Sequence, residues 1–241
     1  MKPFFVITAI LSIFIIYSCE QANTTKECHI GSGNIVSDTI NTEEYFNVLM
    51  EGKGNIFVSQ GTKLQTVIEL DDNLFDYLNI YTKSLQLNIT PVEFICPTRL
   101  NIYLTMPSLE SIKLRGAGTI QNQTPLESMQ IEALIQGNGD VLLYDVHSEY
   151  FISRIAGSGS INASGSSDLC SAEINGNGNI SLENFAVREA SCIIEGNGDV
   201  RISASESLIV RITGNGNVYY KGNPAKFDVK KNGTGVIKQI P

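Results

Sequence analysis

The sequence contains no tryptophan and only two histidines among its 241 residues. Carbohydrate-binding surfaces usually present exposed aromatic rings, so in this chain that role would fall to tyrosines. His29 and His147 are far apart in the sequence and share no metal-ligand spacing, which indicates surface histidines and predicts no metal site. The tyrosines that could contribute to a glycan surface are Tyr144, Tyr150, Tyr219 and Tyr220.

Basic residues are also scarce. The chain has 17 lysines and arginines against 25 aspartates and glutamates, which gives a net charge of −8. An acidic chain with no basic stretch offers little to the phosphates of DNA or RNA, so we expect no nucleic-acid binding. The same charge argues against electrostatic adhesion to an anionic membrane surface.

Only one long apolar run is present, over residues 4–17 after the basic Lys2. The run is too short to cross a bilayer as a stable helix but has the length of the core of a secretory signal. Ser18 directly precedes Cys19, and this pair resembles a bacterial lipobox, although Tyr17 is an unusual neighbour. The resemblance implies a lipoprotein signal peptide over residues 1–18 and a lipid such as palmitate on Cys19. The alternative is an ordinary signal peptide with an incidental cysteine.

The rest of the chain then divides into two parts. Residues 19–29 form a lipidated N-terminus and polar tether, and residues 30–241 form a single domain. We therefore expect an exported protein, lipid-anchored to the outer membrane on its periplasmic or cell-surface face. The expected partners are the membrane, through the N-terminal lipid, and an envelope or extracellular protein or glycan. No cofactor is indicated.

A short motif, Gly-x-Gly-polar-Ile/Val, recurs along the chain. From Gly116 onward its copies are 18 to 21 residues apart, which excludes chance similarity. The gap from Gly52 to Gly116 is 64 residues, about three periods, so degenerate copies are expected inside it. The first glycines of the copies are Gly31, Gly52, Gly116, Gly137, Gly157, Gly176, Gly196 and Gly214, with a weaker copy at Gly233.

Each repeat alternates between apolar and polar residues. Ile or Val stands four residues after the first glycine of every copy from Gly31 to Gly214, and Ile, Leu or Met stands two before it in the copies from Gly52 to Gly214. This period of two is typical of strands with one buried face. We interpret each repeat as strand, glycine turn, strand, then a variable polar link such as residues 147–150 or 222–226.

A period near 20 residues is too short for a βαβ unit or a propeller blade. A single strand pair cannot bury its own apolar face, but stacked copies make each Ile/Val column continuous. The predicted fold is therefore an all-β, right-handed parallel β-helix with one coil per repeat and strands about 4.8 Å apart.

In such a coil the glycines have a structural role. A sharp corner requires residues at positive φ, which glycine or asparagine adopts readily, and stacked asparagines can form amide ladders. Replacing Gly178 with Val is then expected to destabilise the fold more than replacing an outward residue such as Glu173. The proposed structural turn residues are Gly137, Gly139, Gly157, Gly159, Gly176, Gly178, Gly196, Gly198, Gly214 and Gly216.

The glycine motif also resembles several ligand loops, but it lacks their other requirements. Dinucleotide loops require a third glycine and a following helix, and phosphate loops require Lys-Ser/Thr after the second glycine; neither occurs here. Calcium β-roll repeats have nine residues and a regular aspartate, whereas Asp follows the second glycine only at Asp140 and Asp199.

The region between Gly52 and Arg115 is less regular. Residues 71–78 could form one or two helical turns with Asp71 or Asp72 as cap, and residues 83–89 and 99–106 alternate as strands. Residues 221–241 contain five lysines and one acidic residue. Lysines can protect the last coil from edge-to-edge pairing, and the alternative is a functional basic patch.

Four cysteines follow the lipobox. Cys170 and Cys192 fall in inward columns of adjacent coils with Cα atoms roughly 8 Å apart, too far for easy bridging, so we expect buried thiols. Cys28 and Cys96 could form a disulfide in an exported protein, but their positions are not predicted.

Four segments carry a resemblance to a known family: GSGNI (31–35), residues 44–61, residues 71–89 and LTMPSLESIKLRGAGTI (104–120). They resemble the head GIN domain family, an auto-transporter adhesin family that is common in Bacteroidetes. The resemblance covers roughly residues 30–236. It implies a right-handed β-helix-like fold that is exported and usually anchored at the envelope. It brings no catalytic residues to this chain.

The favoured hypothesis is a non-enzymatic envelope lipoprotein, adhesin-like, that presents a surface for binding or scaffolding. The main alternative is a carbohydrate-active enzyme or glycan-binding β-helix, which would need clustered carboxylates in a groove lined by tyrosines. A sensor of envelope state is a third possibility.

Overall fold

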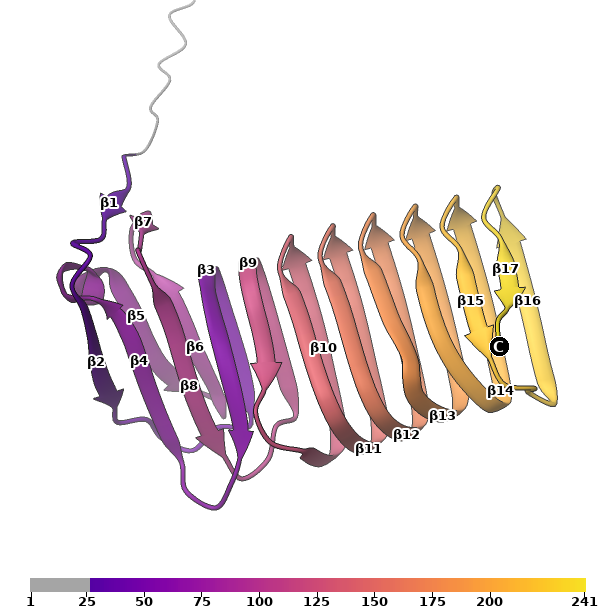
Figure 1. Cartoon of the computed structure of the whole chain (residues 1–241), viewed down its shortest axis with the longest axis horizontal. Coiled ribbons are helices and arrows are strands. Elements are labelled where there is room, and N and C mark those ends of the chain that lie inside the picture. Colours follow the sequence, from indigo (N-terminus) through magenta and orange to yellow (C-terminus); the bar gives the residue numbers. More distant parts are fainter. Residues whose placement is uncertain (1–26) are drawn as a thin grey trace, which may run out of the picture.

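The computed structural model describes residues 27–241, so the predicted signal peptide and Cys19 lie outside the described residues. The described chain is a β-solenoid of about six turns, which confirms the fold class (Figure 1). Within it, no helix is long and apolar enough to cross a membrane. The strands of the regular part are β9 (Ser111–Asn122), β10 (Leu126–Gly137), β11 (Asp140–Gly157), β12 (Ser160–Gly176), β13 (Asn179–Gly196), β14 (Val200–Gly214), β15 (Val218–Lys221), β16 (Lys226–Asn232) and β17 (Ile237–Gln239).

Each central coil is one long strand that bends around the core. β11, β12 and β13 have 17 or 18 residues each and pair in parallel with their neighbours along most of that length. The prediction that residues 147–150 form a link outside the strands is therefore wrong, because they pair with the next coil inside β11. Residues 222–225 do separate two strands, β15 and β16.

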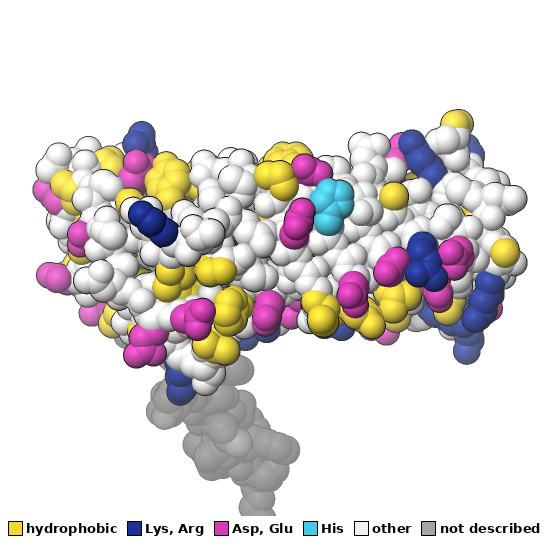
Figure 2. Space-filling view, turned by 90° about the horizontal axis from the view of Figure 1, so that it is seen from below, with side chains coloured by type: hydrophobic (Ala, Val, Ile, Leu, Met, Phe, Trp, Pro, Cys, Tyr) yellow, Lys and Arg dark blue, Asp and Glu magenta, His cyan; other side chains and the backbone are white. Residues whose placement is uncertain are grey.

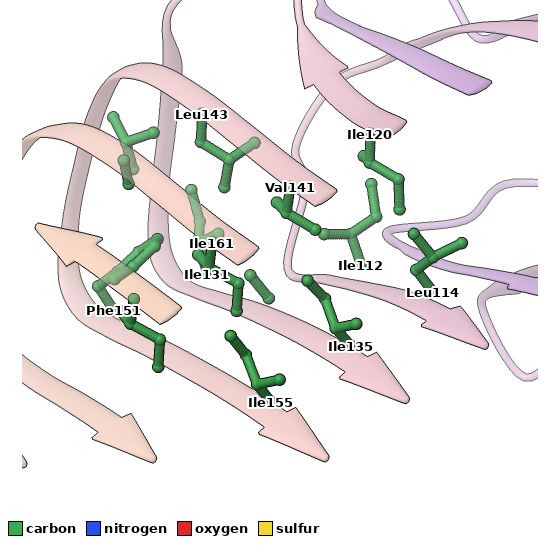
Figure 3. Close-up of a cluster of buried hydrophobic side chains, with 14 of the residues drawn as sticks. Ile112, Leu114, Ile120, Ile131, Ile135, Val141, Leu143, Phe151, Ile155 and Ile161 are labelled. Atoms are coloured by element: carbon green, nitrogen blue, oxygen red, sulfur yellow. The ribbon is translucent and has the colours of Figure 1, made fainter. Parts of the chain in front are cut away.

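The predicted inward columns form the core. Ile135, Ile155 and Ile174 stack two residues before successive glycines, and each is at most 2% exposed. Figure 3 shows side chains of this column and of the column on the opposite strand segments, which includes Val141 and Ile161, pointing toward one another. The buried hydroxyl of Ser153 donates to the carbonyl oxygen of Ser171 at 3.2 Å. The core thus consists of stacked apolar columns, and the polar Ser153 within it is hydrogen-bonded.

At the corner of Gly176 and Gly178, the two glycines are required for different reasons. Gly176 has φ +138°, a conformation that side chains disfavour. Gly178 has no positive φ, but a Cβ there would lie 2.5 Å from the carbonyl oxygen of Gly159 and 2.6 Å from Cγ2 of Ile155. The expectation that asparagines supply positive φ at the corners is wrong, since Asn177 and its equivalents are not among the described residues with positive φ.

The asparagines between the glycines form the predicted ladder instead. The Nδ2 group of Asn197 donates to Oδ1 of Asn177 at 2.9 Å, and Nδ2 of Asn215 donates to Oδ1 of Asn197 at 3.0 Å. Thr234 of the last coil donates to Oδ1 of Asn215 at 2.6 Å. The ladder joins consecutive corners along the outside of the stack.

The stack departs from chain order near its N-terminal end. β3 (Asn47–Gln60) pairs directly with β9, with Gly52 opposite Gly116, and on its other side with β6 (Gln86–Pro91) and β8 (Leu100–Met106). The 64-residue gap therefore holds one degenerate coil, β6 with β8, although a length of about three periods left room for two. The remaining residues of the gap turn back as antiparallel strands.

These strands form the N-terminal end of the solenoid. β2 (Ile35–Ile40) pairs antiparallel with β4 (Gln65–Asp71), and β5 (Leu78–Lys83) with β6. The GSGNI copy at Gly31 is not a corner of the stack; the carboxylate of Asp71 accepts from the backbone N–H of Gly33 at 2.8 Å and holds this loop. Residues 83–89 are not one strand, because Ser84 and Leu85 adopt positive φ in a tight hairpin.

The predicted helical turns are present as the 3₁₀ helix η1 (Asp72–Tyr77). Asp71 occupies the N-cap position, but its side chain makes no capping hydrogen bond. Its carboxylate also accepts from the N–H of Thr98, and these backbone hydrogen bonds lower the pKa of Asp71 even though burial opposes them. The carboxylate of Asp71 therefore does not cap η1 but joins the loops that contain Gly33 and Thr98.

A disulfide fixes the same end. Cys28 and Cys96 are bonded, with Cα atoms 5.7 Å apart, next to the short parallel pair β1 (His29–Ile30) and β7 (Ile95–Cys96). A disulfide typically stabilises a fold by about 2–4 kcal/mol. It ties the start of the described chain to the N-terminal coils.

The contact at Gly178 gives a direct test of the corner. We expect Gly178→Val to lower the free energy of unfolding by about 1–3 kcal/mol, since the added carbons must displace backbone of the previous coil. The exposed Asn175→Ala is the control, expected within about 0.5 kcal/mol of the parent. Urea unfolding followed by circular dichroism measures both, and equal losses would contradict the packing role.

Candidate binding surface

One side of the solenoid carries outward apolar residues. It is formed by residues 130–136, 150–156, 169–175, 189–195 and 207–213 of β10 to β14, and we call it the groove face. Register places Ile152, Ser171, Ser191 and Ile209 in one outward row across four coils. Two large side chains therefore flank two small ones, which leaves a hollow over the two serines.

This hollow is a groove of about 310 Å³. Tyr150 and Leu169 line it from the neighbouring row, and they are 42% and 38% exposed. Glu189 follows them in the same row and is the one carboxylate in the lining. Exposed apolar side chains around a small polar centre are typical of a binding surface.

A second hollow of about 320 Å³ lies further along the same strands, toward the glycine corners. Its walls include Leu134 and Ile193, with Arg154 and Glu173 between them. Arg154 donates to Glu132 at 2.8 Å and to Glu173 at 3.0 Å, so its charge is shared between two carboxylates. The groove face thus combines apolar hollows with a fixed polar row.

Next to the groove face, Asp168, Arg188 and Glu206 give β12, β13 and β14 alternating charges. Figure 2 shows acidic and hydrophobic side chains following one another along one edge of this view. Arg188 donates to Glu206 at 3.0 Å and to Asp168 at 3.3 Å. Glu206 raises the pKa of the Arg188 guanidinium, and Arg188 in turn lowers the pKa of Glu206. The arginine is therefore already paired and does not form an open anion site.

Two thiols lie beneath the groove. Cys170 is 5% exposed and Cys192 is fully buried, and both are free, as the sequence predicted. Burial raises the pKa of Cys170 well above its usual value, with a smaller effect of Cys192, and burial raises the pKa of Cys192 to about 12. They act as small apolar residues of the core.

A hydrogen-bonded triad joins the neighbouring strands β11 and β12, and sequence reasoning missed it. Nε2 of His147 is 3.0 Å from a carboxylate oxygen of Asp145, and Nδ1 is 2.9 Å from Oγ of Ser166. The same residue types serve as acid, base and nucleophile in hydrolases. Here the side chains of His147 and Asp145 are 49% and 63% exposed, and of the three residues only Ser166 lines the neighbouring hollow, which is formed largely by serines. The signal was hidden because the three residues meet only through the register of β11 and β12.

The predicted tyrosines do not converge. Tyr150 lines the groove, and Tyr144 is exposed on the opposite strand segment of β11. Tyr219 lies 4.8 Å from the guanidinium of Arg201, and Tyr220 packs on Phe227 at the last coil. In the groove, Tyr150 is joined by one carboxylate, Glu189, and not by the cluster of carboxylates expected for a carbohydrate-active enzyme.

The histidines also remain separate. His29 stacks on Tyr77 with ring centroids 3.9 Å apart and contacts Glu93 at the N-terminal end, far along the stack from His147. Over the described range, no group of three or more His, Cys, Asp or Glu side chains could hold a metal ion.

Comparison with known proteins gives consistent matches. The sequence model of a family described as "Putative auto-transporter adhesin, head GIN domain" matches residues 31–224. A crystal structure of a "putative adhesin" from Bacteroides fragilis has a TM-score of 0.83 and 23% identity, over 88% of this chain and 100% of that one. A "putative adhesin" from Parabacteroides distasonis has a TM-score of 0.70 and 22% identity, over 89% and 100%. No curated protein matches the chain.

A third structure, titled a "Putative lipid binding protein" from Parabacteroides distasonis, has a TM-score of 0.68 and 20% identity, over 89% of this chain and 100% of that one. At these identities the three structures establish the shared fold.

The buried thiols predict a pH response. In a Cys19→Ser background at pH 8, we expect no reaction of the folded chain with a thiol reagent and two thiols per chain after unfolding. Because the pKa of Cys192 is raised in the fold, unfolding releases a proton above the ordinary thiol pKa of about 8.5. Stability therefore falls as pH rises from there toward 12, and Cys192→Ser should reduce this fall. Rapid labelling of the folded chain would contradict the burial.

Proposed function

Since the chain belongs to the head GIN domain family, we propose that it is a non-enzymatic, adhesin-like binding protein of the cell envelope, anchored to the outer membrane by a lipid on Cys19. The groove face carries this proposal. Tyr150 and Leu169 line a groove of about 310 Å³ on this face, on a backbone that parallel pairing holds rigid. Such a surface binds a partner with little ordering of its own side chains.

The chemistry of the groove indicates the kind of ligand. Its lining is mostly apolar, with serine hydroxyls at the floor and one carboxylate, Glu189. We infer an extracellular or envelope protein that inserts an aliphatic or aromatic side chain between Ile152 and Ile209. A glycan that stacks on Tyr150 is the alternative ligand.

The anchor fits the shape of the described chain. The disulfide at Cys28 fixes the start of the solenoid, so residues 20–27 separate it from Cys19, and a fully extended chain of that length spans at most about 28 Å. The N-terminal coils then stand near the membrane, and the groove of β11 to β14 lies further along the stack (Figure 1). Disulfide formation also agrees with an exported protein.

The test compares two leucines on opposite sides of one solenoid. We expect Leu169→Glu, in the groove, to weaken binding at least tenfold, because a carboxylate would be buried against the ligand (about 1.4 kcal/mol or more). Leu142→Glu, an outward and half-buried leucine of the opposite segment of β11, is the matched control and should keep full binding. Cells that display the full chain are measured for adhesion to panels of extracellular proteins and glycans. Equal losses in both variants, or none, would rule out the groove as the binding site.

A carbohydrate-active enzyme is the second candidate, and the Asp145–His147–Ser166 triad is the observation that favours it. A serine hydrolase would remove acyl groups from glycans with Ser166 as nucleophile. We expect no labelling of Ser166 by a fluorophosphonate probe, since the side chains of His147 and Asp145 are 49% and 63% exposed and water is not excluded from the triad. Labelling that disappears in Ser166→Ala and His147→Ala, with turnover of acetylated glycans, would favour the enzyme.

A further inference from the structure

The two ends of the solenoid are closed to different degrees. At the N-terminal end, η1 covers the core and its Leu74 is fully buried. At the C-terminal end, all seven residues of β16 are exposed. Within residues 27–241, no strand pairs with the outer edge of β16 or of β17. The last coil therefore presents both unpaired backbone and uncovered core.

The uncovered core is visible in two columns. Phe227 pairs with Leu208 and Val229 with Val210, so both continue inward columns of β14. Leu208 and Val210 are fully buried, whereas Phe227 is 45% and Val229 is 41% exposed. These side chains occupy core positions that lack a next layer, and exposed core residues of this kind mark an interaction surface.

Each end also offers two free strand edges. These are β2 and β5 at the N-terminal end and β17 and β16 at the C-terminal end. β2 is antiparallel to β4, which is antiparallel to β8, so β2 runs in the same direction as the long coils. β5 runs in the opposite direction to β6. A second copy in the same orientation would add β2 parallel to β17 and β5 antiparallel to β16.

Charge distinguishes the possible arrangements. β16 and β17 contain four lysines and one aspartate, a net +3 from +4 and −1. β2, η1 and β5 contain three aspartates and one lysine, a net −2 from −3 and +1. Two C-terminal ends would repel each other, whereas a C-terminal and an N-terminal end attract.

We propose that the C-terminal end of one copy, β16 with β17, docks on the N-terminal end of a second copy, β2 with η1 and β5. The solenoid then continues from copy to copy, and the contact covers Phe227 and Val229. Since different surfaces meet, the interface is heterologous and repeats in an open row. The lysines have two effects: they exclude pairing of like ends and select the acidic end of the next copy.

The experiment uses the full chain, extracted in mild detergent and studied by sedimentation velocity over a range of concentrations. At low salt, about 50 mM, we expect a series of oligomers that grows with concentration and shifts to monomer at about 500 mM, where surface charges are screened. Lys226→Glu with Lys230→Glu, and separately Asp38→Lys with Asp76→Lys, should each give monomer. Lys53→Glu with Lys113→Glu changes two lysines of β3 and β9, which lie inside the stack, and is the matched control, expected to associate like the parent.

Mixing the two end variants makes the test specific. An acidic C-terminal end in one chain then faces a basic N-terminal end in the other, so the mixture should associate again although each variant alone is monomeric. Circular dichroism of each variant verifies the fold. A parent that stays monomeric, a dimer that does not grow, end variants that associate unchanged, or a mixture that stays monomeric would each overturn the proposal.

Discussion

The close approach of backbone to backbone at the glycine corner is the constraint on which this structure depends. At Gly178, the position of a missing Cβ lies within contact of the carbonyl oxygen of Gly159 one coil below, and the same relation recurs from corner to corner. No side chain separates the coils there, so each corner fixes the height and register of the next. The Ile columns are aligned because the corners are, and the asparagine ladder follows the same register on the outside. A repeat that keeps its glycines therefore leaves its outward positions free to change.

The groove face is a product of that freedom. Its hollow exists because Ser171 and Ser191 stand where the flanking coils have Ile152 and Ile209. The residue types alter no inward column and no corner. Binding surfaces of this kind consist of ordinary outward positions, and they leave no mark in the repeat itself. Their shape depends on how four coils are aligned. Strand pairing fixes this alignment, because it determines which residues lie side by side.

This difference explains what could be predicted from the sequence. The period, the inward columns and the buried thiols depend on contacts between neighbouring copies, which spacing reveals; Cys170 and Cys192 are buried as their positions in the pattern require. Gly178 was expected as a structural corner residue, but the reason was missed, because it is a short distance between coils and not a positive φ. The spatial order of β8, β3 and β9 was missed because nothing in the sequence indicates that two later strands pair on the two sides of β3. The triad of Asp145, His147 and Ser166 arises only from the register of two strands, and the groove from the register of four.

The crossing at β3 has a consequence for the time course of folding. β3 lies between β8 and β9, both of which follow it in the chain, so its two edges can be paired only after residues up to about position 122 have been made. From β10 onward each new coil can pair with the edge of the coil before it, in chain order. In the N-terminal half, by contrast, one edge of β3 stays unpaired until β9 is available. Contacts of such long sequence separation form slowly. The Cys28–Cys96 bond joins residues that both precede β9 in the chain, and it can hold this half together until β9 pairs with β3.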